Sequence, residues 1–210
     1  MKGLFRHYYS INLIFFHLDL AHNKLSGSMP KYIYNLSQMI TFNYESLYSS
    51  TIDLFTKCQD YVYEVQPERR TIDLSVNNLF GELPPELFRL VQVQTLNLSH
   101  NNLIGAIPKM IGSMKNMESL DLSNNKFYGE IPQSMSLLTF LGYLNLSYNN
   151  FDGKIPIGTQ LQSFNASSYI GNPKLCGAPL IIVPQKKKIL KMQLHLRRMK
   201  TVTPYKNHCI

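Results

Sequence analysis

Few side chains in this 210-residue chain suggest catalysis or metal binding. His100 and Asp121 would lie on adjacent strands of a repeat, but one histidine near one aspartate usually belongs to a polar face. The sequence contains no glycine-rich phosphate loop, kinase catalytic loop, Asp-Phe-Gly, G-x-S-x-G or H-E-x-x-H. We therefore expect no catalytic residue, no metal site and no cofactor, and we predict that the chain is not an enzyme.

The three cysteines, Cys58, Cys176 and Cys209, are an odd number without metal-ligand spacing. If the chain is exported, at least one of them is free or pairs with another molecule.

The pattern L-x-L-x-x-N-x-L-x-G-x-x-P recurs every 24 residues in copies beginning at Ile72, Leu96, Leu120 and Leu144. An earlier copy begins at Leu18. A fixed period of about 20 to 29 residues with this core is typical of a leucine-rich-repeat solenoid, whose coils bury their apolar faces on one another. The predicted fold class is an α/β solenoid, a horseshoe with a parallel concave sheet and a 3₁₀ or irregular convex side.

Each repeated position has a physical role. The two leucines of L-x-L point to one side of a short strand, and the asparagine amide can bridge backbone groups between coils. This structural ladder comprises Asn77, Asn101, Asn125 and Asn149. Apolar residues then recur at every third position, which favours a 3₁₀ turn: Leu87, Leu90, Val93, Ile111, Met114, Met117, Met135, Leu138 and Leu141.

The net charge of +8 lies entirely in the last 30 residues. Residues 1–180 contain 13 basic and 13 acidic side chains, whereas residues 181–210 contain 8 basic and none acidic. Any interaction with a polyanion would therefore concern the tail alone, and we expect no nucleic-acid partner for the repeats.

Export and membrane signals are weak. No stretch approaches the roughly 18 to 20 apolar residues that span a bilayer. The apolar run near Met1 to Phe16 is short, contains Asn12 and lacks a small-residue cleavage pattern, so it does not favour a signal peptide. Four N-x-S glycosylation candidates occur, at Asn35, Asn97, Asn145 and Asn165.

The repeat consensus, the interrupted array and the closing segment Ser163 to Leu180 resemble plant leucine-rich-repeat receptor-like proteins of the disease-resistance type. The resemblance covers about Leu18 to Leu180, and Thr56 to Tyr61 is similar to the end of the family's island segment. It implies a C-terminal fragment of a plasma-membrane glycoprotein receptor in plant defence signal transduction, on the extracellular side. Some relatives carry a kinase domain, of which this chain has no motif.

On this basis the chain divides as follows: 1–17, a degenerate partial repeat; 18–42, one leucine-rich repeat; 43–71, an island-like insertion; 72–159, four 24-residue repeats; 160–180, a C-terminal cap; and 181–210, a basic tail that we expect to be disordered.

The sequence departs from the family after the cap. No second cysteine follows Cys176 before Cys209, and a lysine-rich ending replaces the membrane-spanning segment after Leu180. A membrane is therefore a partner only if that segment is restored. Ile189, Met192, Leu196 and Met199 give the tail a weak basic amphipathic pattern that is compatible with a membrane surface or a nuclear-import patch. We favour a solvated, disordered extension from altered splicing or a shifted frame.

The exposed strand positions form the predicted binding face for a protein or peptide ligand and a receptor-kinase co-receptor. They are Asp73, Ser75, Val76, Thr95, Asn97, Ser99, His100, Ser119, Asp121, Ser123, Asn124, Tyr143, Asn145, Ser147 and Tyr148. Tyr143 and Tyr148 are the expected anchors, because aromatic side chains dominate interface energies. Tyr61 and Tyr63 are further candidate binding residues, in the island-like insertion. The alternatives are a soluble inhibitor of microbial enzymes, which the missing N-terminal cap disfavours, and a truncated product without function.

Overall fold

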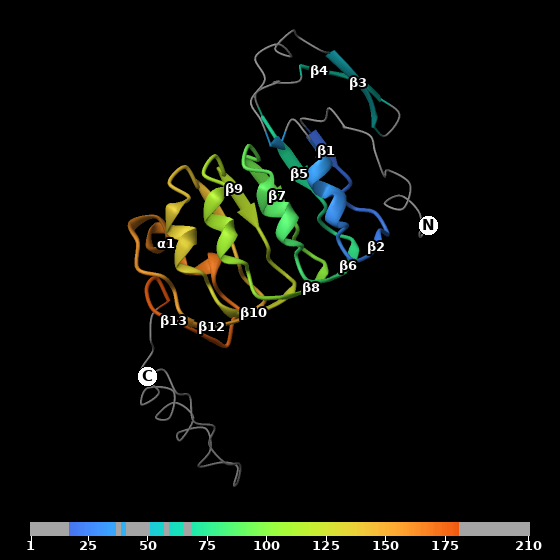
Figure 1. The fold of residues 1–210 in the computed structure, drawn as a ribbon. Helices are drawn as coiled ribbons and strands as arrows, with labels where there is room; N and C mark the ends of the chain where they lie inside the picture. The colour runs from blue at the N-terminus through green and yellow to red at the C-terminus, as the bar shows by residue number, and fades with distance from the viewer. Residues whose placement is uncertain (1–16, 37–38, 41–50, 57–58, 65–68, 181–210) are drawn as a thin grey trace, which may run out of the picture.

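The computed structural model describes residues 17–36, 39–40, 51–56, 59–64 and 69–180 (Figure 1). Within them each repeat forms one coil of a solenoid, which confirms the predicted fold class. The upstream residues 1–16, the tail 181–210, Cys58 and Cys209 lie outside this part of the chain.

The L-x-L segments form a five-stranded parallel sheet in the order β1-β5-β7-β9-β11. Its strands are β1 His17–Asp19, β5 Thr71–Asp73, β7 Thr95–Asn97, β9 Ser119–Asp121 and β11 Tyr143–Asn145. Leu18 pairs directly with Ile72, although 54 positions separate them in the sequence. The insertion therefore leaves and rejoins the solenoid without interrupting the sheet. The exposed side of this five-stranded sheet is called the concave face below.

A second parallel sheet lies on another side of each coil, along the lower edge of the solenoid in Figure 1, in the order β13-β12-β10-β8-β6-β2. Its strands are β2 Ser26–Gly27, β6 Asn78–Gly81, β8 Asn102–Gly105, β10 Lys126–Glu130, β12 Asn150–Lys154 and β13 Lys174–Cys176. The sequence analysis missed this sheet. Leu79 is buried between exposed Asn78 and Phe80, an alternation too short to stand out beside the repeat period.

Short 3₁₀ helices follow the second sheet, as the three-residue apolar spacing predicts. They are η1 Lys31–Asn35, η4 Pro85–Arg89, η5 Lys109–Ser113 and η6 Gln133–Leu137. Each begins directly after a proline of the repeat, whose φ lies between −72° and −63°. The proline ring fixes this extended entry and needs no backbone hydrogen-bond donor.

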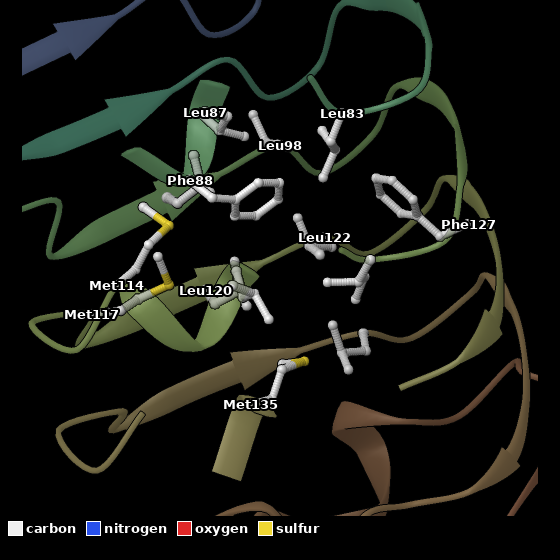
Figure 2. Packing of buried hydrophobic residues seen from close by; sticks show 14 of the residues in the cluster. Leu83, Leu87, Phe88, Leu98, Met114, Met117, Leu120, Leu122, Phe127 and Met135 are labelled. Carbon is white, nitrogen blue, oxygen red and sulfur yellow. The ribbon is translucent and has the colours of Figure 1, made fainter. Parts of the chain in front are cut away.

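The core runs continuously through the stacked coils. All nine apolar residues that recur at every third position, from Leu87 to Leu141, are buried in it. Phe127 and Phe151 stack with ring centroids 6.2 Å apart. Phe88, which the sequence pattern did not place in the core, is buried in the same cluster as Met114 and Met117, and Figure 2 labels all three.

The described part of the insertion is a hairpin of β3 Thr51–Thr56 and β4 Gln59–Glu64 (Figure 1). After the last repeat come α1 Thr159–Ser163, η7 Ala166–Ser168 and β13. Ser168 and Ile170 accept backbone hydrogen bonds from Leu146 and Tyr148, so this segment covers the edge of the concave sheet.

Candidate ligand-binding face

Four serines that the sequence analysis placed on the exposed stripe are buried, which corrects that expectation. They are Ser75, Ser99, Ser123 and Ser147, and none is more than 6% exposed. Each serine N–H donates to the side-chain oxygen two residues earlier, at 2.8 to 3.2 Å. This Asx turn bends the chain at the strand end and turns the small serine inward.

The last residue of each strand from β5 to β11, which lies between the two leucines of L-x-L, belongs to a row of alternating acids and amides across the concave face. Asn97 donates from Nδ2 to Asp73 Oδ2 at 3.0 Å, and Asn145 makes the same bond to Asp121 at 3.2 Å. The amides thus separate the carboxylates and hold their side chains in place, half-buried in the sheet. These residues therefore form a polar row on the concave face whose side chains are held by hydrogen bonds between strands.

Tyr143 lies at the C-terminal end of this face, 49% exposed. Its hydroxyl donates to Asp121 Oδ2 at 3.1 Å. Partial burial and, to a lesser extent, the Asp121 charge and hydrogen bond raise the pKa of Tyr143 above its ordinary value. The hydroxyl is therefore protonated at neutral pH, and its hydrogen bond orients the ring toward Asp121.

The next row protrudes from the face in an uncommon backbone conformation. His22, Val76, His100, Asn124 and Tyr148 all have φ of 53° or 54°. The left-handed region is a genuine outlier for a β-branched residue such as valine. This shared conformation was not predicted from the sequence, because the valine and tyrosine in the row do not favour it, although His22, His100 and Asn124 are of types enriched there.

The backbone of this row is held across the sheet. Val76 N–H donates to the Ser99 carbonyl at 3.0 Å, and His100 and Asn124 repeat the bond to the next coil. Val76 and Tyr148 are 38% and 55% exposed. His100 lies 3.3 Å from the Asn124 amide, so the structure brings it to Asn124 and shows no bond to Asp121.

The asparagine ladder lies beneath this face. Each ladder Oδ1 accepts a backbone N–H from the preceding coil at 2.9 to 3.0 Å, and each Nδ2 donates to a carbonyl of that coil at 2.9 Å. Asn172 continues the ladder into the closing segment, bonding to Phe151 and Leu146. The sequence could have predicted Asn172 as a further ladder residue, because Tyr169 precedes Asn172 by three residues, as Leu146 precedes Asn149.

The glycosylation candidates differ in access. Asn165 is exposed, Asn35 is half-buried in η1, and Asn97 and Asn145 are half-buried with their amides bonded to carboxylates. On the insertion, Tyr61 and Tyr63 lie on β4, opposite Leu54 and Ile52.

Within the described ranges, no three histidine, cysteine, aspartate or glutamate side chains are grouped to hold a metal. In the same part of the chain no helix combines the length and apolar character needed to cross a membrane.

Two family models describing the leucine-rich repeat match residues 70–127 and residues 16–36 and 140–165. Together they cover half of the chain. Comparison with curated protein sequences gave no match.

The solved structures that are similar to this chain include three from Arabidopsis. The ectodomain of the receptor kinase GASSHO1/SCHENGEN3, in complex with CASPARIAN STRIP INTEGRITY FACTOR 2, is 37% identical with a TM-score of 0.59. The alignment covers 78% of this chain and 16% of that one. A chain of the BIR3–SERK2 complex is 31% identical over 75% of this chain and 67% of its own, with a TM-score of 0.56.

The third structure is the receptor kinase HAESA in complex with the peptide hormone IDA and the co-receptor SERK1. It is 28% identical over 80% of this chain, with a TM-score of 0.51. The chain spans about a quarter or less of the matched GASSHO1 and HAESA-complex chains. From the repeats, the sheets and these matches, the chain belongs to the leucine-rich-repeat proteins and is structurally similar to plant receptor-kinase ectodomains.

Proposed function

We propose that this chain is the ligand- or co-receptor-binding part of a plant cell-surface receptor-like protein that acts in defence by binding a peptide or protein. The similar structures include receptors in complex with CASPARIAN STRIP INTEGRITY FACTOR 2, with IDA and with SERK1. The defence role rests on the resemblance of the repeats and closing segment to disease-resistance receptors.

The observation that carries the binding role is the protruding row on the concave face. Val76 and Tyr148 share a backbone conformation that favours asparagine or glycine, yet both present exposed apolar side chains. Neither side chain is needed by the core, and valine lowers stability there. Backbone strain retained without a packing benefit is typical of functional surfaces.

The C-terminal end of the face offers the best anchors. Tyr143 begins β11 and Tyr148 lies three residues after its end, where its N–H donates to the carbonyl of exposed Ile170 at 2.8 Å. A side chain at Gly171 would come within 2.7 Å of the Tyr148 ring, so the glycine lets the ring rest on the backbone. A ring held in this way loses little entropy when it binds.

The size of the face suits a short extended peptide. Five strands about 4.8 Å apart span roughly 19 Å, which an extended chain covers in about six residues. The acid–amide row offers hydrogen-bond acceptors along this path, and the tyrosines offer an apolar end.

Selection from a phage-displayed library of random linear peptides, with the full chain as target, tests the proposal. Peptides bound to the unaltered chain are expected to bind Tyr148→Ser at least about tenfold more weakly. Met110→Ser is the matched control, because Met110 is 47% exposed on η5, outside the concave sheet. Enriched peptides that bind Tyr148→Ser as strongly as the parent would exclude the concave face.

Two further probes separate the finer claims. The purified SERK1 ectodomain tests co-receptor binding directly, and loss of its binding in Tyr148→Ser would assign it to this face. Peptide pools from microbial cultures and from plant tissue test the defence role, which predicts that the microbial pool contains the ligands. Ligands found only in the plant pool would favour a hormone-type receptor.

A further inference from the structure

The outer side of the six-stranded sheet carries an exposed apolar row that the concave-face function does not use. Phe80 on β6, Ile104 on β8 and Tyr128 on β10 are 54%, 41% and 47% exposed. Phe80 pairs with Asn102 and Ile104 pairs with Lys126, so the row runs obliquely across neighbouring strands. The three side chains therefore form one stripe on one face.

The fold does not require apolar residues at this position. The equivalent residues are Ser26 in β2 and Asp152 in β12, both polar. The stripe thus occupies only the three central coils. An apolar centre with a polar border is the usual composition of a protein interface.

Charges lie on the two sides of the stripe in an unequal way. Lys126 is exposed on the side nearer the strand starts. Glu82 and Glu130 are exposed on the other side, together with Lys154 at the next equivalent position, so that side keeps a net negative charge. The glutamate side chains lean over glycines of the next coil: a Cβ on Gly105 would lie 2.8 Å from Glu82 Cγ, and one on Gly153 3.0 Å from Glu130 Cγ. They are therefore placed beside the stripe.

We propose that this face is a self-association surface, on which a second copy of the chain packs stripe against stripe. Two symmetric arrangements bring the stripes together. If the two-fold axis runs along the stripe, the Lys126 side of one copy faces the Glu82 and Glu130 side of the other. If the axis crosses the stripe, acidic side meets acidic side. Charge complementarity selects the first arrangement.

The predicted glycans would leave this face open. Of the four N-x-S positions, Asn97 and Asn145 lie in the concave sheet, Asn35 lies in η1 and Asn165 precedes η7. None lies in the six-stranded sheet, so an exported and glycosylated chain would still present the stripe.

The available area sets the expected strength. Three large side chains, each about half exposed, offer roughly 300 Å² of apolar surface per copy. An interface built around so small an apolar centre belongs with the small, transient ones, so we expect a weak dimer.

Sedimentation equilibrium of the full chain from about 1 to about 100 μM measures the association. A reducing agent is included, so that dimers linked through cysteines do not contribute. We expect a monomer–dimer equilibrium that Ile104→Asp abolishes. Phe140→Asp is the matched control: Phe140 is 68% exposed outside both sheets, and its replacement should leave the equilibrium unchanged.

A charge reversal tests the geometry. Lys126→Glu should weaken the dimer about tenfold, because it places like charges on facing sides. The triple variant Lys126→Glu, Glu82→Lys, Glu130→Lys exchanges the two sides and should restore the parental affinity. Circular dichroism and the melting temperature verify that each variant folds.

A chain that stays monomeric to about 100 μM, or a dimer unaffected by Ile104→Asp, overturns the proposal. If another protein occupies the stripe instead, the chain will be monomeric alone. Peptide binding to the concave face is measured separately, so either function can fail without the other.

Discussion

The side chain of Asn172 donates a hydrogen bond to the Leu146 carbonyl at 3.0 Å, and its Oδ1 accepts from Phe151 N–H. The closing segment, although it lacks the repeat sequence, thus satisfies the same backbone groups as a further coil would. The polar ladder beneath the concave face therefore ends on a bonded residue rather than on exposed carbonyls. This ladder gives the first prediction.

Asn101→Ala should lower the free energy of unfolding by about 1 to 3 kcal/mol, because buried backbone groups of two coils lose their partners. Asn101 bonds to Leu74 and Leu79 of the preceding coil. Urea denaturation followed by circular dichroism measures the change. Asn102→Ala is the matched control, since its side chain is exposed in β8 and should change stability by less than about 0.5 kcal/mol.

The same reasoning ranks the ladder by position. Asn172→Ala should cost as much as Asn101→Ala. Asn23→Ala should cost less, because Asn23 is exposed and its side chain bonds, among the residues that the structure describes, to Leu20 and Ala21 of its own coil. Equal costs at Asn23 and Asn101 would show that bonds between coils add nothing to the ladder.

How far the sequence predicted this structure depends on the kind of signal. The solenoid, the parallel strands and the 3₁₀ turns followed from residues such as Leu96 and Leu87, whose spacing is fixed by burial. The backbone of Val76 was not predictable, because neighbouring coils and not the valine itself impose its conformation. Ser99 was placed on the wrong side because an Asx turn interrupts the strand alternation.

The position of Val76 gives a second prediction. A non-glycine residue in the left-handed region costs roughly 1 to 2 kcal/mol, and asparagine tolerates it better than valine. Val76→Asn should therefore stabilise the chain by about 1 kcal/mol. Asn124 has the same φ of 53°, so Asn124→Val should destabilise it by a similar amount.

Both variants are measured by urea denaturation, and the reciprocal pair separates backbone strain from side-chain contacts. If Val76→Asn is less stable than the parent, the strain is absent, and the argument that this row is retained for binding loses its basis.

The glycines of the second sheet give a third prediction. Gly153 has φ of 72°, and a Cβ there would lie 3.0 Å from Glu130 Cγ. Gly153→Ala should cost about 1 to 2 kcal/mol, chiefly through the backbone. Gly142→Ala is the matched control, because the nearest atom, the Glu118 carbonyl oxygen, is 3.8 Å away. Adding Glu130→Ala to Gly153→Ala should recover only the part due to crowding, and full recovery would show that the backbone angle is unstrained.

The last prediction concerns Tyr169, which is 1% exposed and donates its hydroxyl to the Leu161 carbonyl at 2.5 Å. Burial raises the pKa of this tyrosine above its ordinary value, because the charged phenolate would lose its water. As the pH rises above about 10, the unfolded chain releases this proton while the folded chain retains it. The stability that this buried hydroxyl contributes is therefore complete below a pH of about 10, and the free energy of unfolding should fall above it by up to about 1.4 kcal/mol per pH unit.

Tyr169→Phe should be less stable at neutral pH, since the Leu161 carbonyl loses its donor. Its unfolding free energy should, however, fall less steeply between about pH 10 and 11. Urea denaturation across this range measures both slopes, with Tyr128→Phe as the exposed control, and equal slopes for parent and Tyr169→Phe would rule out a buried protonated hydroxyl.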